Sequence, residues 1–376
     1  MRPISPTVSG KVNRNEAPAH VSMSPMNLAI LAITPNGADL ARRLGTLLSG
    51  VEVWLPERFR TDDACRYYRE PLNVRIATLF EQFEGLICIM ATGIVVRLLA
   101  QHLRGKQHDP AVVVLDEAGQ FAISLLSGHL GGANSLAEEI GHALGATPVI
   151  TTATDVNQLC AWDEAARTAG LLVEPVSHIK HLNRMLLEGE RVALVDPERM
   201  IDTHYADNRR VVTCQSRQEA LECQPHGIVW VGRDHIPGLE DEPHWLALRP
   251  RDLVVGIGCN RDTSTAEIAR AVDVTLTDAG LSTASLCSVA SIDAKRDEVG
   301  LLDFATGREL PIVFYSSADL NEVDVPGTPS PYVLAAVGAK GVCEPAAVLA
   351  AGSGPLLVPK RKLGNVTVAV AQKVES

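Results

Sequence analysis

The chain has 376 residues, of which 46% are hydrophobic and 21% are charged, a composition typical of folded globular domains. Its formal net charge of -11 repels polyanions and its 4% aromatic residues leave few platforms for stacking bases, so we expect no nucleic-acid partner. The length predicts two or three domains, and the longest uncharged apolar stretch, 85–96, falls short of the ~20 residues of a membrane-spanning helix.

Residues 1–26 are rich in proline without any periodicity, which predicts a disordered leader, or an upstream start-site artefact, before order begins near Asn27. These residues also lack the apolar segment of a secretory signal. The eight cysteines are scattered, with neither a C-x-x-C pair nor metal-ligand spacing. We therefore expect a cytoplasmic protein with reduced thiols and no membrane association.

Residues 27–159 alternate short apolar runs with helical segments. We expect strands at 28–34, 85–90, 111–115, 120–125 and 148–152, a turn at 35–37, and helices at 38–48, 94–102 and 134–144, the last capped by Asn134 or Ser135. This alternation predicts an N-terminal α/β domain with a largely parallel sheet.

Residues 160–250 contain more proline and charge and predict a smaller middle α/β module. Its expected helices are 161–169 and 177–188, its expected strands are 191–196 and 227–232, and Arg249-Pro250-Arg251 is the best linker candidate. Residues 251–376 form the C-terminal α/β domain, with strands at 253–257, 285–292 and 311–315, a Ser264-x-x-Glu267 capping box, a helix capped by Ser330 and a terminal hairpin around 360–365. The fold class is three α/β modules with mainly parallel or mixed sheets.

The segment Ser127–Asn134 places three glycines where a strand meets a helix. Free N–H groups at such a helix start attract anions, so Gly131, Gly132 and Asn134 are candidates for binding a carboxylate, phosphate or oxyanion. His129 in this loop is a candidate acid or base, or an axial ligand to a metal inside a cofactor. The alternatives are a tight turn that needs glycine and a structural histidine.

The segment Gly256–Ser264 begins like a nucleotide-binding loop but lacks the third glycine of the dinucleotide motif and the Gly-Lys of a P-loop, so neither NAD nor ATP is predicted. Arg261 is able to hold a carboxylate, and Cys259 is either a nucleophile or, more simply, a packing residue. All histidines precede residue 250. Proton transfer in the last domain would therefore need other groups, such as the carboxylates and the lysine of Asp293–Glu298. The alternative is that this segment is a solvated loop.

Two groups of basic residues stand out in this acidic chain. Lys360-Arg361-Lys362 lies between two expected strands, where it would meet an anionic ligand or form a solvated face, and Arg97 leads a second group with Arg104 and Lys106. His178 and His181 have metal-like spacing but no third ligand, so we predict no metal site.

Several short stretches occur together in a characteristic order: Met90–Arg97, Leu115–Gly119, Ser127–Asn134, Gly256–Cys259, Ser291–Glu298, Pro329-Ser330, Gly341–Ala347 and Leu357–Lys362. Jointly they resemble the cobalt-precorrin-5A hydrolase family, CbiG, of anaerobic cobalamin biosynthesis, over roughly 27–372. The family has an N-terminal domain, a middle domain and a C-terminal domain similar to the stand-alone CobE protein. Asn260-Arg261-Asp262 departs from the family, which more often has basic residues and glycine there, and the leader has no counterpart.

The resemblance implies hydrolysis of the ring A δ-lactone of a cobalt corrinoid with loss of acetaldehyde, in a cleft between the N- and C-terminal domains. The cobalt would come with the substrate, and no cofactor would be bound by the protein itself. His129 would be the acid or base, with Asp116 and Asp293 as alternative bases. The candidates for substrate binding are Thr92, Gly93, Arg97, Gly131, Gly132, Asn134, Gly258, Arg261, Ser330, Glu344, Lys360 and Arg361.

Two rival functions are compatible with parts of this pattern. A non-catalytic corrinoid carrier would share the basic sites and bind without releasing acetaldehyde, and neighbouring pathway enzymes are candidate partners in either case. A methyltransferase that uses S-adenosylmethionine would also be α/β, but no acidic strand end is paired with a glycine-rich loop to hold its nucleoside.

Overall fold

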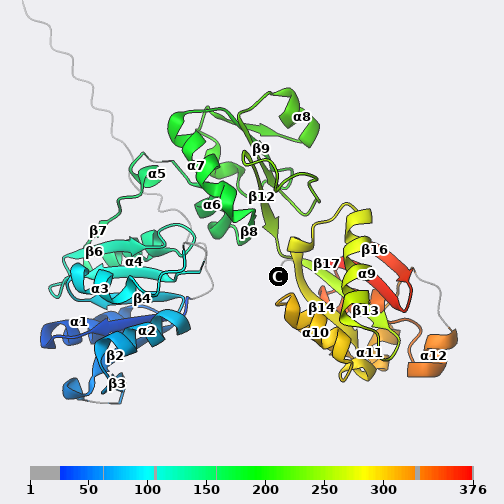
Figure 1. The fold of residues 1–376 in the computed structure, drawn as a ribbon, viewed down its shortest axis with the longest axis horizontal. Coiled ribbons are helices and arrows are strands. Elements are labelled where there is room, and N and C mark those ends of the chain that lie inside the picture. Colours follow the sequence, from blue (N-terminus) through cyan, green and yellow to red (C-terminus); the bar gives the residue numbers. More distant parts are fainter. Residues whose placement is uncertain (1–25, 62, 106–107, 158, 327–330, 375–376) are drawn as a thin grey trace, which may run out of the picture.

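The computed structural model describes residues 26–374 except 62, 106–107, 158 and 327–330. The predicted leader before Met26 and the predicted cap Ser330 lie outside the described residues. Figure 1 shows three sheets with flanking helices in three lobes that follow one another along the chain. This arrangement confirms the predicted α/β class with parallel and mixed sheets.

The N-terminal sheet has seven strands in the order β3-β2-β1-β4-β5-β6-β7. The strands are β1 (Leu28–Ala32), β2 (Val51–Pro56), β3 (Arg66–Tyr68), β4 (Gly85–Ile89), β5 (Ala111–Leu115), β6 (Phe121–Leu126) and β7 (Thr147–Val149). Every residue of β1, β4 and β5 is buried, as expected of parallel strands covered on both faces. The helices are α1 (Pro35–Leu47), α2 (Leu72–Gln82), α3 (Thr92–Leu99) and α4 (Ala133–Leu144).

The direction of β6 decides where the glycine-rich loop lies. Strands β1 to β5 are parallel, so their following loops meet at the carboxyl edge of the sheet, but β6 pairs antiparallel with β5. The loop after β6 therefore returns to the opposite edge, where the Ser127 hydroxyl donates to the Asp109 carbonyl at 2.9 Å. It faces the middle module, and its Leu130 packs against that module's core.

Two helix starts differ from the sequence prediction. The expected turn at 35–37 is the first turn of α1, because the Thr34 hydroxyl caps it by accepting from the Gly37 amide. The predicted caps Asn134 and Ser135 are wrong, since α4 begins after Gly132, whose φ of 83° is left-handed and suits glycine.

The middle sheet has the order β10-β9-β11-β12-β8. Its elements are α5 (Ala153–Val156), α6 (Trp162–Thr168), β8 (Leu171–Glu174), α7 (Ile179–Glu188), β9 (Val192–Val195), β10 (Val211–Cys214), α8 (Arg217–Glu222), β11 (Gly227–Val231) and β12 (Trp245–Pro250). The predicted linker Arg249-Pro250-Arg251 is wrong for its first two residues, which end β12, and of the three only Arg251 lies between β12 and the next strand. Arg249 is buried, with its Nε 3.0 Å from Glu174 Oε2.

The C-terminal sheet has the order β15-β14-β13-β17-β16. Its elements are β13 (Leu253–Cys259), α9 (Thr265–Asp278), β14 (Leu286–Ile292), α10 (Val299–Gly307), β15 (Ile312–Tyr315), α11 (Ser317–Glu322), α12 (Pro331–Val337), α13 (Cys343–Ala350), β16 (Leu356–Leu363) and β17 (Val366–Gln372). Ser264 caps α9 as predicted, but Glu267 accepts from the Asn365 amide at 3.0 Å instead of completing a capping box.

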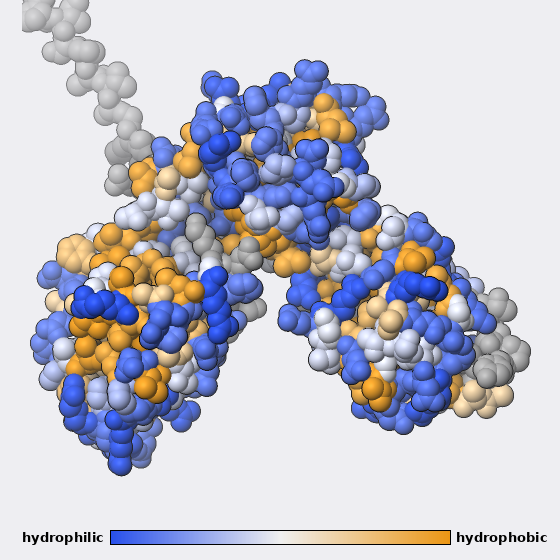
Figure 2. All heavy atoms as spheres, in the orientation of Figure 1, coloured by the Kyte–Doolittle hydropathy of each residue, from blue (hydrophilic) through white to orange (hydrophobic). Residues whose placement is uncertain are grey.

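Each module has its own apolar core, built on the two faces of its sheet. Figure 2 shows a mostly hydrophilic surface in this view, with apolar residues gathered on one face of the N-terminal lobe. Among the described residues, none of the helices combines the length and hydrophobicity that crossing a bilayer requires.

Candidate active site

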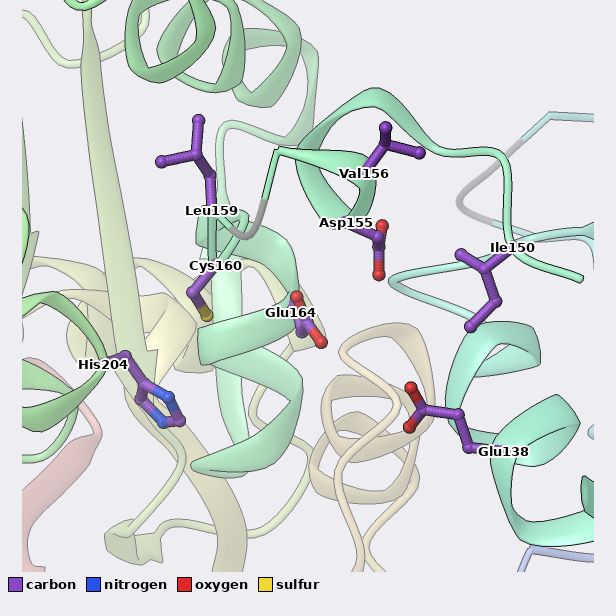
Figure 3. Close-up of a pocket in the computed structure, with 8 residues that line it drawn as sticks. All are labelled: Glu138, Ile150, Asp155, Val156, Leu159, Cys160, Glu164 and His204. Atoms are coloured by element: carbon purple, nitrogen blue, oxygen red, sulfur yellow. The ribbon is translucent and has the colours of Figure 1, made fainter. Parts of the chain in front are cut away.

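A cavity of about 490 Å³ opens where the N-terminal module meets the middle module. Its lining comes from α4, from the segment around α5 and from α6, together with His204. The lining residues are Glu138, Ile150, Asp155, Val156, Leu159, Cys160, Glu164 and His204. Figure 3 shows the carboxylates of Glu138, Asp155 and Glu164 turned toward one another across this space.

His129 reaches this region from the glycine-rich loop. Its side chain is 10% exposed, with Nε2 2.9 Å from Thr154 Oγ1 and 3.4 Å from Asp155 Oδ2. On the other side of the ring, Nδ1 lies 3.9 Å from Glu164 Oε2 and is buried without a hydrogen-bond partner among the described residues. The predicted acid or base thus stands between two carboxylates from a different part of the chain.

Asn134 orients one of these carboxylates. Its Nδ2 donates to both oxygens of Asp155 at 3.2 Å, and its Oδ1 accepts from the Ser124 hydroxyl at 2.6 Å. The residue is almost fully buried. Asn134 therefore acts on the cavity through Asp155, and its predicted direct contact with substrate stays a prediction.

Three amides of the glycine-rich loop and the start of α4 are used by the loop itself. The N–H groups of Gly132, Ala133 and Asn134 donate to the carbonyls of His129, Ser127 and Gly128 at 3.0 to 3.1 Å. A Cβ at Gly131 would lie 2.4 Å from Ser127 Cβ, so glycine is needed for close packing. The loop itself therefore uses the amides of Gly132, Ala133 and Asn134, and anion binding by Gly131 stays a prediction.

Burial shapes the chemistry of the groups around the cavity. Burial raises the pKa of the Glu164 carboxyl, the charge of Asp155 raises it further, and the nearby His129 opposes the rise. Burial also raises the pKa of the Cys160 thiol to about 12. Cys160 is therefore protonated at neutral pH and is no nucleophile.

The candidates Thr92, Gly93, Arg97 and Asp116 lie at the opposite, carboxyl edge of the N-terminal sheet. Arg97 is exposed on α3, and a Cβ at Gly93 would lie 3.5 Å from its Nη1. The Asp116 carboxylate accepts from the amides of Ala118, Gln120 and Phe121 at 2.8 to 3.1 Å. Asp116 therefore closes the β5–β6 turn, and the structure does not bring it to His129.

The remaining candidates lie in the C-terminal module, and most of the charged ones have partners there. Arg261 contacts Asp297 at 2.6 Å, Asp293 contacts Arg296 at 2.8 Å, and Arg361 contacts Asp278 at 3.0 Å. The buried carboxylate of Glu344 accepts from the Lys360 amide at 3.0 Å, and Thr367 donates to the Gly258 carbonyl at 3.1 Å. The basic run 360–362 belongs to β16 and not to the hairpin turn.

Sequence reasoning missed Glu138, Thr154, Asp155 and Glu164. The available signal was a polar run, Thr151–Asp155, at the end of an expected strand, a position where functional side chains often lie. The separation along the chain hid its connection to His129, because the two segments meet only at the border of two modules.

Three family models match consecutive parts of the chain: Cobalamin synthesis G N-terminal at 75–155, Cobalamin biosynthesis central region at 160–250 and Cobalamin synthesis G C-terminus at 253–371. The chain is 36% identical over 352 residues to the cobalt-precorrin-5A hydrolase of Priestia megaterium, covering 91% of this chain and 94% of that protein. It is 35% identical over 350 residues to the protein of the same name from Salmonella typhimurium, covering 92% and 98%. A solved putative cobalamin biosynthesis protein G homolog from Sulfolobus solfataricus is 20% identical, covering 93% and 97%, with a TM-score of 0.36.

Proposed function

Because the chain belongs to the CbiG family of cobalamin biosynthesis, we propose that it is the hydrolase that converts cobalt-precorrin-5A into cobalt-precorrin-5B. The reaction is hydrolysis of the ring A δ-lactone with release of acetaldehyde. The observation that carries the proposal is the similarity to cobalt-precorrin-5A hydrolases over nearly the full length of both chains. We place the reaction in the cytoplasm, which the eight free cysteines support.

The proposal assigns water activation to the His129 cluster. A water loses a proton to this cluster as its oxygen bonds to the lactone carbonyl carbon. The ring C–O bond then breaks, and the ring oxygen leaves as an alkoxide. Its collapse breaks a C–C bond and releases acetaldehyde, while the electron pair passes to the macrocycle. Support comes from the burial of His129 and from the carboxylates of Asp155 and Glu164 within 4 Å of its ring.

Substrate binding by the other candidates is part of the same proposal. A corrinoid precursor has several carboxylate arms, and exposed cations such as Arg97 and Lys360 are suited to hold them. Arg97 lies at the sheet edge opposite to the His129 loop, so it would hold an arm that extends away from the reacting ring. Gly258, Arg261, Glu344 and Arg361 complete this set at the C-terminal module. The cleft between the N- and C-terminal modules also stays a prediction.

The test is anaerobic incubation of the full chain with cobalt-precorrin-5A, with acetaldehyde and corrinoid product measured separately. We expect one acetaldehyde per product molecule, and a loss of turnover of about 10²-fold or more in His129→Ala, because general acid–base groups contribute about that much. His142→Ala, an exposed change on α4, is the matched control and should keep normal turnover. Tight corrinoid binding without acetaldehyde would replace the hydrolase by a carrier, and binding of S-adenosylmethionine would favour the methyltransferase.

A further inference from the structure

The cavity at the border of the N-terminal and middle modules has a charge that does not suit its proposed substrate. Three carboxylates, Glu138, Asp155 and Glu164, line it. A corrinoid precursor with acetate and propionate arms is a polyanion, and like charges in a partly buried space repel strongly. A cation at this place would remove the conflict.

The side chains that face one another there are metal ligands by type and by distance. One ring nitrogen of His129 and one oxygen each from Asp155 and Glu164 all lie within 4.8 Å of one another. Ligands about 2.1 Å from a tetrahedral ion are separated by about 3.4 Å. The two carboxylates approach different ring nitrogens of His129, with Asp155 Oδ2 3.4 Å from Nε2 and Glu164 Oε2 3.9 Å from Nδ1. Because one ion takes only one of these nitrogens, the side chains have to rotate to close the remaining separations, which are at most 4.8 Å for one ligand atom from each residue.

A second observation is independent of the acidic residues. His129 Nδ1 is buried and has no hydrogen-bond partner within the part of the chain that the structure describes, although it faces Glu164. A buried polar atom without a partner needs an explanation. If Nδ1 carries the lone pair of the imidazole, a cation held between Nδ1 and the carboxylates would provide the missing partner.

The surrounding residues resemble the outer shell of a metal site. Metal-binding histidines commonly hydrogen-bond through their other ring nitrogen, and metal-binding carboxylates are themselves hydrogen-bonded. Thr154 Oγ1 lies 2.9 Å from His129 Nε2, which leaves Nδ1 as the lone-pair nitrogen when Nε2 donates. Asn134 donates to both oxygens of Asp155.

We propose that His129, Asp155 and Glu164 together bind one divalent transition-metal ion of the Zn²⁺ type. The site itself stands on geometry, while its role rests on the proposed hydrolase function. One imidazole and two carboxylates leave a fourth position for water, as in catalytic zinc sites. In this version the ion, instead of the side chains alone, would activate the water: it would lower the pKa of a bound water, whose proton would pass to solvent and not to His129, and the ring C–O bond would break after the water oxygen has bonded to the lactone carbonyl carbon, without any oxidant or reductant.

The experiment uses the full chain, stripped with EDTA and desalted, with Zn²⁺ as the probe. Calorimetric titration and elemental analysis after gel filtration should both give one Zn²⁺ per chain. His129→Ala and Glu164→Gln should weaken binding by at least tenfold, and Thr154→Val, which removes only the outer hydroxyl, should weaken it by about 10- to 100-fold. Circular dichroism and the unfolding midpoint of each zinc-free variant report whether it is folded.

Two controls separate this site from other zinc ligands of the chain. His181 and His244 have ring centroids 6.3 Å apart, so His181→Ala tests that pair, and Glu139→Gln tests an exposed carboxylate of α4. Both variants should bind Zn²⁺ normally. Failure to bind one Zn²⁺, unchanged binding by folded His129→Ala and Glu164→Gln, or loss of binding in His181→Ala would each overturn the site.

The titration contains no corrinoid, so its result tests the metal site independently of the hydrolase proposal. Zinc binding without turnover of cobalt-precorrin-5A would leave the site and remove the function. Full turnover by EDTA-stripped, zinc-free protein would leave the function and overturn the role of the metal.

Discussion

The border between the N-terminal and middle modules differs from the carboxyl edge of the C-terminal sheet in how its charges are balanced. At the border, Asp155 and Glu164 flank a buried histidine and share one cavity with Glu138. At the C-terminal edge, Arg261 is paired with Asp297, and elsewhere in the same module Arg361 is paired with Asp278, the last residue of α9.

This difference separates charge that is available for chemistry from charge that is used to hold the fold. Exposed ion pairs contribute ~0.2 to 1 kcal/mol. A paired surface cation that exchanges its acidic neighbour for a charged ligand therefore adds little net free energy of binding. A buried group without a matched partner pays a desolvation penalty that a ligand can offset. The border is therefore the better candidate for the reacting centre.

The largest expected effect compares two aspartates with the same substitution. Asp155→Asn should lower turnover of cobalt-precorrin-5A by about 10²- to 10⁴-fold, because it removes a charge next to His129. Asp293→Asn should change turnover by less than about threefold, because Asp293 pairs with Arg296 in another module. The measurement is kcat/KM on folded protein. Equal losses in the two variants would contradict the assignment of the reacting centre to the border between the N-terminal and middle modules.

A buried ion pair in the C-terminal motif should matter for stability. Lys295 Nζ lies 3.0 Å from Glu298 Oε2, and both side chains are at least nine-tenths buried. Lys295→Met should therefore reduce the free energy of unfolding by about 3 to 5 kcal/mol, because it leaves a buried carboxylate with the more distant Arg261 as its nearest cation.

Arg296→Met is the control for Lys295→Met, since its pair with Asp293 is exposed and should be worth at most about 1 kcal/mol. Urea unfolding of both variants gives the comparison. If Lys295→Met proves as stable as the parent but loses turnover, Lys295 belongs to the reacting machinery and the C-terminal edge has been underestimated.

Gly256, the first residue of the apparent nucleotide motif, should prove to be a packing residue. A Cβ there would lie 1.9 Å from the Cys343 carbonyl oxygen, because α13 packs directly on β13. Gly256→Ala should lower the free energy of unfolding by about 1 to 3 kcal/mol. Gly307→Ala has open space at its Cβ and should be neutral or slightly stabilising, which thermal or urea unfolding would distinguish.

The smallest effect concerns two neighbours in β16. Lys360 is exposed and has no ion pair among the described residues, whereas Arg361 pairs with Asp278. Lys360→Ala should raise KM up to about fivefold, more at low salt than at high salt, while Arg361→Ala should raise KM by less than Lys360→Ala, because Asp278 already pairs with Arg361. An increase of KM in Arg361→Ala alone would reverse their assigned roles.

Local sequence patterns were enough to identify the α/β class and many of its elements. The apolar runs at 85–90 and 111–115 contain buried strands, α4 ends at Leu144, and Ser264 caps α9 as predicted. These features depend on residues close together in the chain, because periodicity and capping are local interactions. The strands β2 and β3 and the helix α2 in 51–84 were not assigned.

The surroundings of His129 depended on contacts between distant segments. Its loop could be identified from its glycines, but the antiparallel pairing of β6 with β5 placed that loop at the edge away from Thr92, Arg97 and Asp116. Asp155 and Glu164 reached His129 because α5 and α6 follow β7 across the same edge. Spacing along the chain does not encode strand direction or module packing, so the sequence supplied the histidine and the tertiary structure supplied its carboxylates.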